Sequence, residues 1–133
     1  MKTATQFLEQ LVAEFPELRE QVEEDSGALH LQMASFARMT QTAIDAGDFE
    51  TLRRQFMLAD RFFRDAGPDL QNAFHVSYLE HLNLCGPHGQ RARDLMSTAL
   101  RKGWQDIMDY LDLLFRKGQK DRQELAPPGM GGG

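Results

Sequence analysis

Apolar residues recur every three to four positions in one segment of this chain after another, and no other feature constrains the fold as strongly. Such a period places apolar side chains along one face of an α-helix, and that face must be buried against a neighbouring element. No stretch combines an alternation of period two with an enrichment in β-branched residues, so strands are not expected. The chain is therefore predicted to be all-α, a compact bundle of about six to seven helices built from antiparallel helical hairpins.

Capping and breaking residues place the expected helices along the chain. Thr3-x-x-Gln6 has the form of a capping box, Pro16 suits the first turn of a helix, and Gly47 suits the left-handed position that ends one. Between these signals the periodic segments have the lengths of ordinary helices. We expect helices at residues 17–24, 28–46, 49–66, 69–84 and 98–117, with a first helix before Pro16 and a short one ending near Met96.

Residues 69–84 make up the most apolar of these helices, and we expect them at the centre of the bundle. Apolar side chains point in nearly every direction around this helix, which is typical of a helix with neighbours on several sides. The final helix has a single apolar face, which is expected to lie against the core. That face consists of Leu100, Trp104, Ile107, Met108, Leu111, Leu114 and Phe115.

The length of 133 residues fits one domain. Residues 1–124 are predicted to form a single helical domain, and residues 125–133, which are rich in Pro and Gly, a disordered tail. The tripeptide Asp-Ala-Gly ends two of the expected helices, at residues 45–47 and 65–67. This weak repeat keeps open a scaffold of stacked helical hairpins, although such arrays need three or more repeats.

The negative charge of the chain is concentrated at its N-terminal end. The first 25 residues hold two basic and seven acidic side chains, a difference of −5, whereas the remaining residues hold 13 of each. One short segment therefore sets the whole-chain net charge of −5. We predict that its carboxylates form a surface that docks a basic protein partner. These residues are Glu17, Glu20, Glu23, Glu24 and Asp25.

A solvated helix surface without a partner is the alternative interpretation of these carboxylates. Glu17, near a helix N-terminus, is favourable there on its own account. Glu20 and Glu24, however, are four residues apart and repel each other across one helix face, a cost that a purely structural helix can avoid. The repulsion supports docking and the helix N-terminus supports a solvated surface, so both interpretations stay open at this point.

Asp106, Asp109 and Asp112 form a second acidic row on the outer face of the last expected helix. Three carboxylates in line can grip a basic patch, so we include them in the predicted partner-binding surface. With a fourth ligand they can also hold a metal ion, but dedicated sites usually draw His or Glu from two helices. We predict no metal and no other cofactor.

The alternative function is a small-ligand binder or an enzyme that uses the central helix and the loop Cys85–His88. His75 and His81 are six residues apart, not the three or four that place two ligands on one helix face, so we expect hydrogen-bonded core histidines. Cys85 is expected to be a small buried hydrophobe. No P-loop, zinc-protease or nucleophile-elbow motif occurs, and we assign no catalytic residue.

Composition also limits the compartment and the partners. A single cysteine excludes an intramolecular disulfide and favours a reducing compartment. We find no secretory signal, and no apolar run approaches the roughly 20 residues that span a bilayer. The acidic balance argues against nucleic acid. We expect a cytoplasmic monomer or small homo-oligomer that binds neither membrane nor nucleic acid.

Residues 31–37 (LQMASFA) and 72–82 (NAFHVSYLEHL), together with Leu95-Met96 and Lys102-Gly103-Trp104, resemble a family of small uncharacterised bacterial all-helical proteins, a domain of unknown function. The resemblance implies a helical fold and a bacterial origin, and it carries over no catalytic residues. Proteins of this kind are loosely similar in outline to the immunity proteins paired with bacterial toxins. The expected function is a non-enzymatic protein-binding module, immunity-like or antitoxin-like, whose partner is for instance a toxin domain with a basic surface.

Overall fold

The computed structural model describes the backbone of residues 1–125 and the side chains of residues 1–120. All regular elements in this part of the chain are helical, which confirms the all-α prediction. The predicted disordered tail, residues 125–133, lies outside the described residues except for Leu125, which ends the last helix. The elements are α1 (Ala4–Glu14), the 3-10 turn η1 (Pro16–Leu18), α2 (Arg19–Glu24), α3 (Leu29–Ala46), α4 (Phe49–Phe63), α5 (Pro68–Ser77), the 3-10 turn η2 (Leu79–His81), α6 (Gly89–Leu95) and α7 (Thr98–Leu125).

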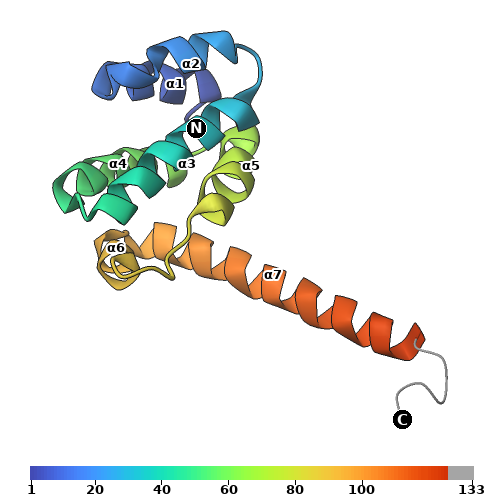
Figure 1. Ribbon diagram of the computed structural model, residues 1–133. Helices are drawn as coiled ribbons and strands as arrows, with labels where there is room; N and C mark the ends of the chain where they lie inside the picture. The colour runs from blue at the N-terminus through green and yellow to red at the C-terminus, as the bar shows by residue number, and fades with distance from the viewer. Residues whose placement is uncertain (126–133) are drawn as a thin grey trace.

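The capping and helix-ending residues predicted from the sequence begin and end helices at the expected positions. At the start of α1 the Gln6 backbone N–H donates to the Thr3 hydroxyl at 3.2 Å, and the Thr3 backbone N–H donates to Gln6 Oε1 at 2.9 Å, which completes the capping box. Gly47 ends α3 with a left-handed φ of 68°, and the Asp48 side chain caps α4. Because only these two residues connect α3 to α4, the helices fold back on each other as a hairpin (Figure 1).

Aromatic rings from α1, α3 and α5 form the centre of the core. The centroid of the Phe7 ring lies 5.8 Å from that of Phe36 and 5.1 Å from that of Phe74. Tyr78 stacks on Phe36 at 4.7 Å, and its hydroxyl shares a 2.9 Å hydrogen bond with Thr40. All five side chains are buried, so this polar pair is satisfied inside apolar surroundings.

The segment 69–84 is central, but the prediction that it forms one helix is wrong. α5 ends at Ser77, η2 follows, and the backbone is extended at Leu82. In a continuous helix, the apolar side chains of this segment would point in nearly every direction and some would face solvent. The change of direction after Ser77 lets Leu82 and Leu84 be buried as well as the apolar side chains of α5.

The second Asp-Ala-Gly tripeptide does not end a helix as the first one does. α4 stops at Phe63, and Gly67, with a φ of −66°, precedes α5 in an extended conformation. The N-terminus holds this connection: the Lys2 N–H donates to the Asp65 carbonyl at 2.6 Å, and the Gly67 N–H donates to the Lys2 carbonyl at 2.8 Å. The repeat that supported a stacked scaffold is therefore one of sequence and not of structure.

α7 is longer than predicted and leaves the body of the protein part-way along its length (Figure 1). Leu100 is fully buried and Trp104 is only 9% exposed, so the first turns of α7 belong to the core. Leu114 and Phe115, in contrast, are 46% and 59% exposed. The apolar face predicted for this helix exists as a periodic stripe, but its burial declines along the helix: Ile107, Met108 and Leu111 are half-buried, and the last two residues of the stripe are exposed.

Candidate functional site

The predicted acidic segment lies on η1 and α2, at the end of the molecule away from the projecting part of α7 (Figure 1). Four of its five carboxylates are exposed. Asp25 is half-buried and accepts a hydrogen bond from Gln21 Nε2 at 2.9 Å. Within the described residues none of the five forms an ion pair. The segment thus presents four negative charges to solvent without a neutralising partner. The four residues are Glu17, Glu20, Glu23 and Glu24.

One buried side of the short helix α2 fixes this segment on the body. Val22 is 8% exposed and belongs to the core. Gln32, which is buried on α3, donates from Nε2 to the Val22 carbonyl oxygen at 2.9 Å. Since successive helical residues are turned by about 100°, the carboxylates of Glu20 and Glu24 point away from the side that Val22 buries. The direction of the charges is therefore set by the packing of α2.

A hollow of about 330 Å³ adjoins the acidic segment, and residues of η1, α3 and α4 line it. Glu17 and Gln55 are among these residues. Gln55 is 1% exposed, and its Oε1 has no hydrogen-bond partner. A buried acceptor left unsatisfied costs about 1–3 kcal/mol, which a donor from an incoming group would offset. The hollow combines a free carboxylate with an unpartnered acceptor.

The second predicted acidic row lies on the projecting part of α7 and is not continuous with the acidic segment (Figure 1). Asp106 pairs with Lys102 at 3.0 Å, and Asp112 pairs with Arg116 at 3.1 Å. Asp109 accepts a hydrogen bond from a side-chain amide one turn earlier on the same helix. The structure therefore does not bring the two sets of carboxylates onto one surface. Among the described residues no three His, Cys, Asp or Glu side chains are grouped so as to hold a metal ion.

Two histidines of the alternative site lie far from each other. The His75 ring packs edge-on against Phe63 at 5.2 Å, and the His88 ring packs edge-on against Phe49 at 5.5 Å. Phe49 and Phe63 are the first and last residues of α4, which places them roughly 20 Å apart along the helix axis. These histidines therefore cannot act on one ligand.

His81 and Cys85 are both exposed, so the expectations of a core histidine and a buried cysteine at these positions are wrong. The reason is the early end of α5. Once the helix stops at Ser77, residues beyond it no longer follow its apolar arc, and the alternation of buried and exposed residues in the extended stretch decides which side chains reach solvent.

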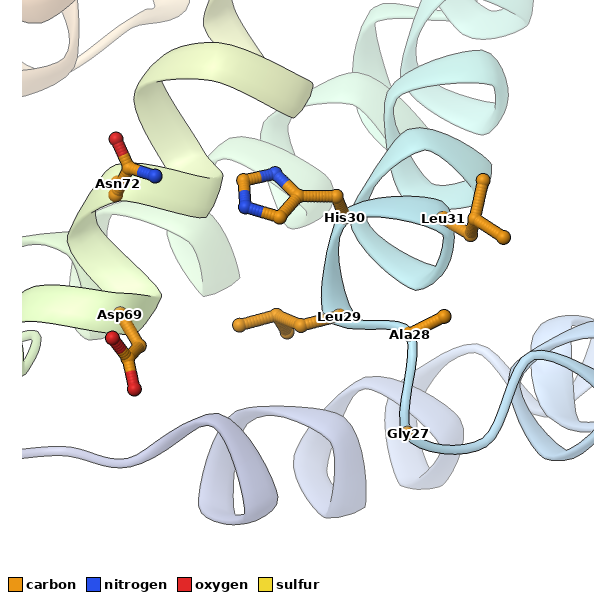
Figure 2. A pocket seen from close by; sticks show the side chains of 7 residues that line it. All are labelled: Gly27, Ala28, Leu29, His30, Leu31, Asp69 and Asn72. Atoms are coloured by element: carbon orange, nitrogen blue, oxygen red, sulfur yellow. The ribbon is translucent and has the colours of Figure 1, made fainter.

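The sequence gives no role to His30, yet it lines a hollow of about 380 Å³ where α3 begins beside α5 (Figure 2). Figure 2 shows its ring directed from α3 towards α5, with Asp69 and Asn72 facing the same space. His30 Nδ1 shares a 2.6 Å hydrogen bond with Ser77 Oγ. Ser77 is only 5% exposed, so this hydroxyl is shielded from a substrate, and the pair serves to tie α3 to α5. The available signal was the polar Ser77 on the face of α5 that otherwise carries Leu70, Ala73 and Phe74.

No helix in the described part of the chain is both long and apolar enough to cross a membrane. Comparison with known proteins finds a match to the family described as Domain of unknown function (DUF7674), over residues 8–112. No curated protein and no solved structure matches the chain. The matched residues include the segments that carry the resemblance, 31–37 and 72–82, and extend through the first half of α7. With well over half of its length matched, the chain belongs to the DUF7674 family of domains of unknown function.

Proposed function

We propose that this protein is a non-enzymatic protein-binding module that docks a basic partner on the acidic segment of η1 and α2. The observation that carries the proposal is the exposure of four carboxylates without an ion pair in the described structure. Elsewhere some carboxylates pair with cations of the chain, as with Asp60 and Arg64 at 2.9 Å and Glu14 and Arg61 at 3.7 Å, and others are unpaired but form no comparable group in the described part of the chain. The acidic segment differs in grouping four exposed, unpaired carboxylates within residues 17–24.

Electrostatics supports a basic partner for this surface. Like charges at helical spacing destabilise a helix by a few tenths of a kcal/mol per pair, and an approaching cation reverses the sign of that contribution. A concentrated field of one sign also raises the rate of association with a surface of the other sign. Both effects favour a partner whose contact surface is rich in Lys and Arg.

The adjoining hollow favours a basic side chain at the centre of the contact. A Lys ammonium or an Arg guanidinium carries only hydrogen-bond donors, three and five N–H groups respectively. Glu17 offers such a group a carboxylate, and Gln55 offers it the unpartnered Oε1. The Glu17 carboxylate is exposed, whereas Gln55 Oε1 is covered from solvent, so a long basic side chain would reach the second acceptor only by displacing the side chains that cover it.

In finer terms we propose a bacterial immunity-like or antitoxin-like protein, whose partner is a toxin domain with a basic surface. The support is the small, acidic, all-helical build that the chain has in common with such proteins in outline. A module of this kind acts by covering its partner, so it needs a complementary surface and no reacting groups of its own.

The first test is affinity capture of the full chain with a tag, from a lysate of its native cells, beside the Glu20→Lys, Glu24→Lys double variant. A stoichiometric partner is expected to bind the wild-type chain at low salt and to be lost at about 0.5 M salt, where the Debye length falls to a few ångström. The double variant is expected not to retain it.

The matched control, Glu80→Lys with Asp94→Lys, reverses the charge at two positions elsewhere in the chain. It changes the net charge by the same amount as the double variant does. Both residues lie outside the acidic segment, on η2 and α6. The control variant should retain the partner. Retention by the double variant, or binding that about 0.5 M salt leaves intact, would contradict the docking mechanism. With the purified partner, Gln55→Met should weaken binding without changing any charge.

A further inference from the structure

Residues 1–3 precede α1 and lie against the connection between α4 and α5. Lys2 pairs with Ala66 as a parallel β-bridge, through the Lys2 N–H on the Asp65 carbonyl and the Gly67 N–H on the Lys2 carbonyl. Within the described residues this bridge stands alone, outside any strand. Two hydrogen bonds without a neighbouring ladder can open far more readily than the core unfolds.

The Lys2 side chain makes a second attachment to the same place. Its Nζ donates to the Arg61 carbonyl oxygen at 3.1 Å and lies 4.9 Å from the centroid of the Phe62 ring. Arg61 belongs to the last turn of α4, where carbonyls lack a partner within the helix and the helix dipole attracts a cation. Phe62 is only 7% exposed, and its ring face attracts the same charge. An apolar side chain of similar length would reproduce neither attraction.

Release of Lys2 does not require α1 to move. The capping box joins Thr3 to Gln6 within the start of α1, and the buried Phe7 fixes this helix in the core. The hydrogen bonds and the ring contact of Lys2, in contrast, all reach residues between 61 and 67. Rotation of the backbone just before Thr3 is therefore enough to detach residues 1 and 2.

Lys2 also separates two hollows in the surface. One, of about 340 Å³, is lined by residues 1–5 and 67–70. The other, of about 360 Å³, lies beside α1. Lys2 lines both, so its withdrawal removes a wall that they share and uncovers the ring of Phe62. The residues that line the second hollow with Lys2 are Gln6, Glu9, Gln10 and Phe62.

We propose that residues 1 and 2 form a releasable clasp on the α4–α5 connection, with the Lys2 ammonium as its latch. Release of the clasp joins the two hollows into one groove along α1 and leaves the core intact. It also frees the Asp65 carbonyl and the Gly67 N–H, which the closed clasp occupies. The proposal does not involve the acidic segment of η1 and α2.

Native-state hydrogen exchange of the full chain, followed by NMR at low urea concentrations, tests whether the clasp opens locally. The Gly67 amide reports the clasp, and the Tyr78 amide, which donates to the Phe74 carbonyl, reports the core. Relative to its rate in an unstructured chain, Gly67 should exchange at least about tenfold faster than Tyr78, with little dependence on urea. Equal protection and equal urea dependence of the two amides would overturn the proposal, because the connection would then open only with the whole fold.

A matched pair of variants tests the latch. Lys2→Met keeps a long side chain and removes the ammonium, and Lys102→Met removes the same charge from an exposed lysine that pairs with Asp106. We expect Lys2→Met to raise the exchange rate of the Gly67 amide by about fivefold or more, and Lys102→Met by less than about twofold. An unchanged rate in Lys2→Met, or equal effects of the two variants, would show that the Lys2 ammonium is not a latch.

Discussion

Replacing Glu24 by lysine is expected to stabilise the protein while it weakens docking of a basic partner. Glu24 is exposed at the last position of α2, where the helix dipole disfavours a negative charge. It also lies one turn after Glu20 and repels it. The lysine reverses both contributions, because a cation is favourable at a helix C-terminus and a Glu followed four residues later by Lys is an attractive pair.

The magnitude follows from these two interactions. Loss of the repulsion and gain of the attraction contribute about 0.2–0.5 kcal/mol each, and the change of sign at the helix end contributes about 0.3–1 kcal/mol at low ionic strength. Solvent screening at an exposed site places the total near the lower end of this range. We therefore expect the free energy of unfolding to rise by about 0.5–1 kcal/mol in low salt, and by less than half of that at 1 M salt.

Urea unfolding at low and high salt measures this difference, and Glu23→Lys is the control with the same change of net charge. Glu23 lies one turn after Arg19, so a lysine there exchanges an attraction for a repulsion while it relieves the repulsion from Glu20. These pairing contributions nearly cancel, so only the favourable effect of a cation in the last turn of α2 remains, and Glu23→Lys should stabilise the protein clearly less than Glu24→Lys does. Equal stabilisation by both variants would mean that net charge and not local pairing is responsible, and a loss of stability in Glu24→Lys would refute the reasoning.

Three further predictions concern the body of the protein. Tyr78→Phe and Thr40→Val should each cost about 1–3 kcal/mol in urea unfolding because each leaves a buried hydroxyl unpaired, whereas the double variant should cost less than the sum of the two. Burial raises the pKa of the Tyr78 hydroxyl well above its usual range, and the hydrogen bond with Thr40 only partly lowers it. Above a pH of about 10 the unfolded chain ionises this group and the folded chain does not, so the free energy of unfolding should fall by about 1.4 kcal/mol per pH unit in the wild type relative to Tyr78→Phe. Gly89→Ala should prevent folding or shift the loop, because a Cβ there would lie 1.8 Å from the Leu84 carbonyl oxygen, and circular dichroism with thermal melting would detect either outcome.

The elements that the sequence predicts well are those set by local chemistry. Thr3, Gly47 and Asp48 act within a few residues of themselves, so their caps and turns need no knowledge of the rest of the fold. The length of α5 depends instead on tertiary packing. Leu82 and Leu84 reach the core only because the helix stops at Ser77, and no local signal marks that residue as an end.

In the candidate site, too, features set by local sequence could be predicted and features set by tertiary packing could not. The exposure of Glu20 and Glu24 was predictable, because charge at helical spacing next to a buried Val22 leaves them only the solvent side. The unpartnered Gln55 was not, since the helical period indicates that a residue is buried but not whether its amide finds a partner. The uncovered face of α7 lies between these cases: the stripe is visible in the sequence, but where the body stops covering it is a matter of tertiary structure.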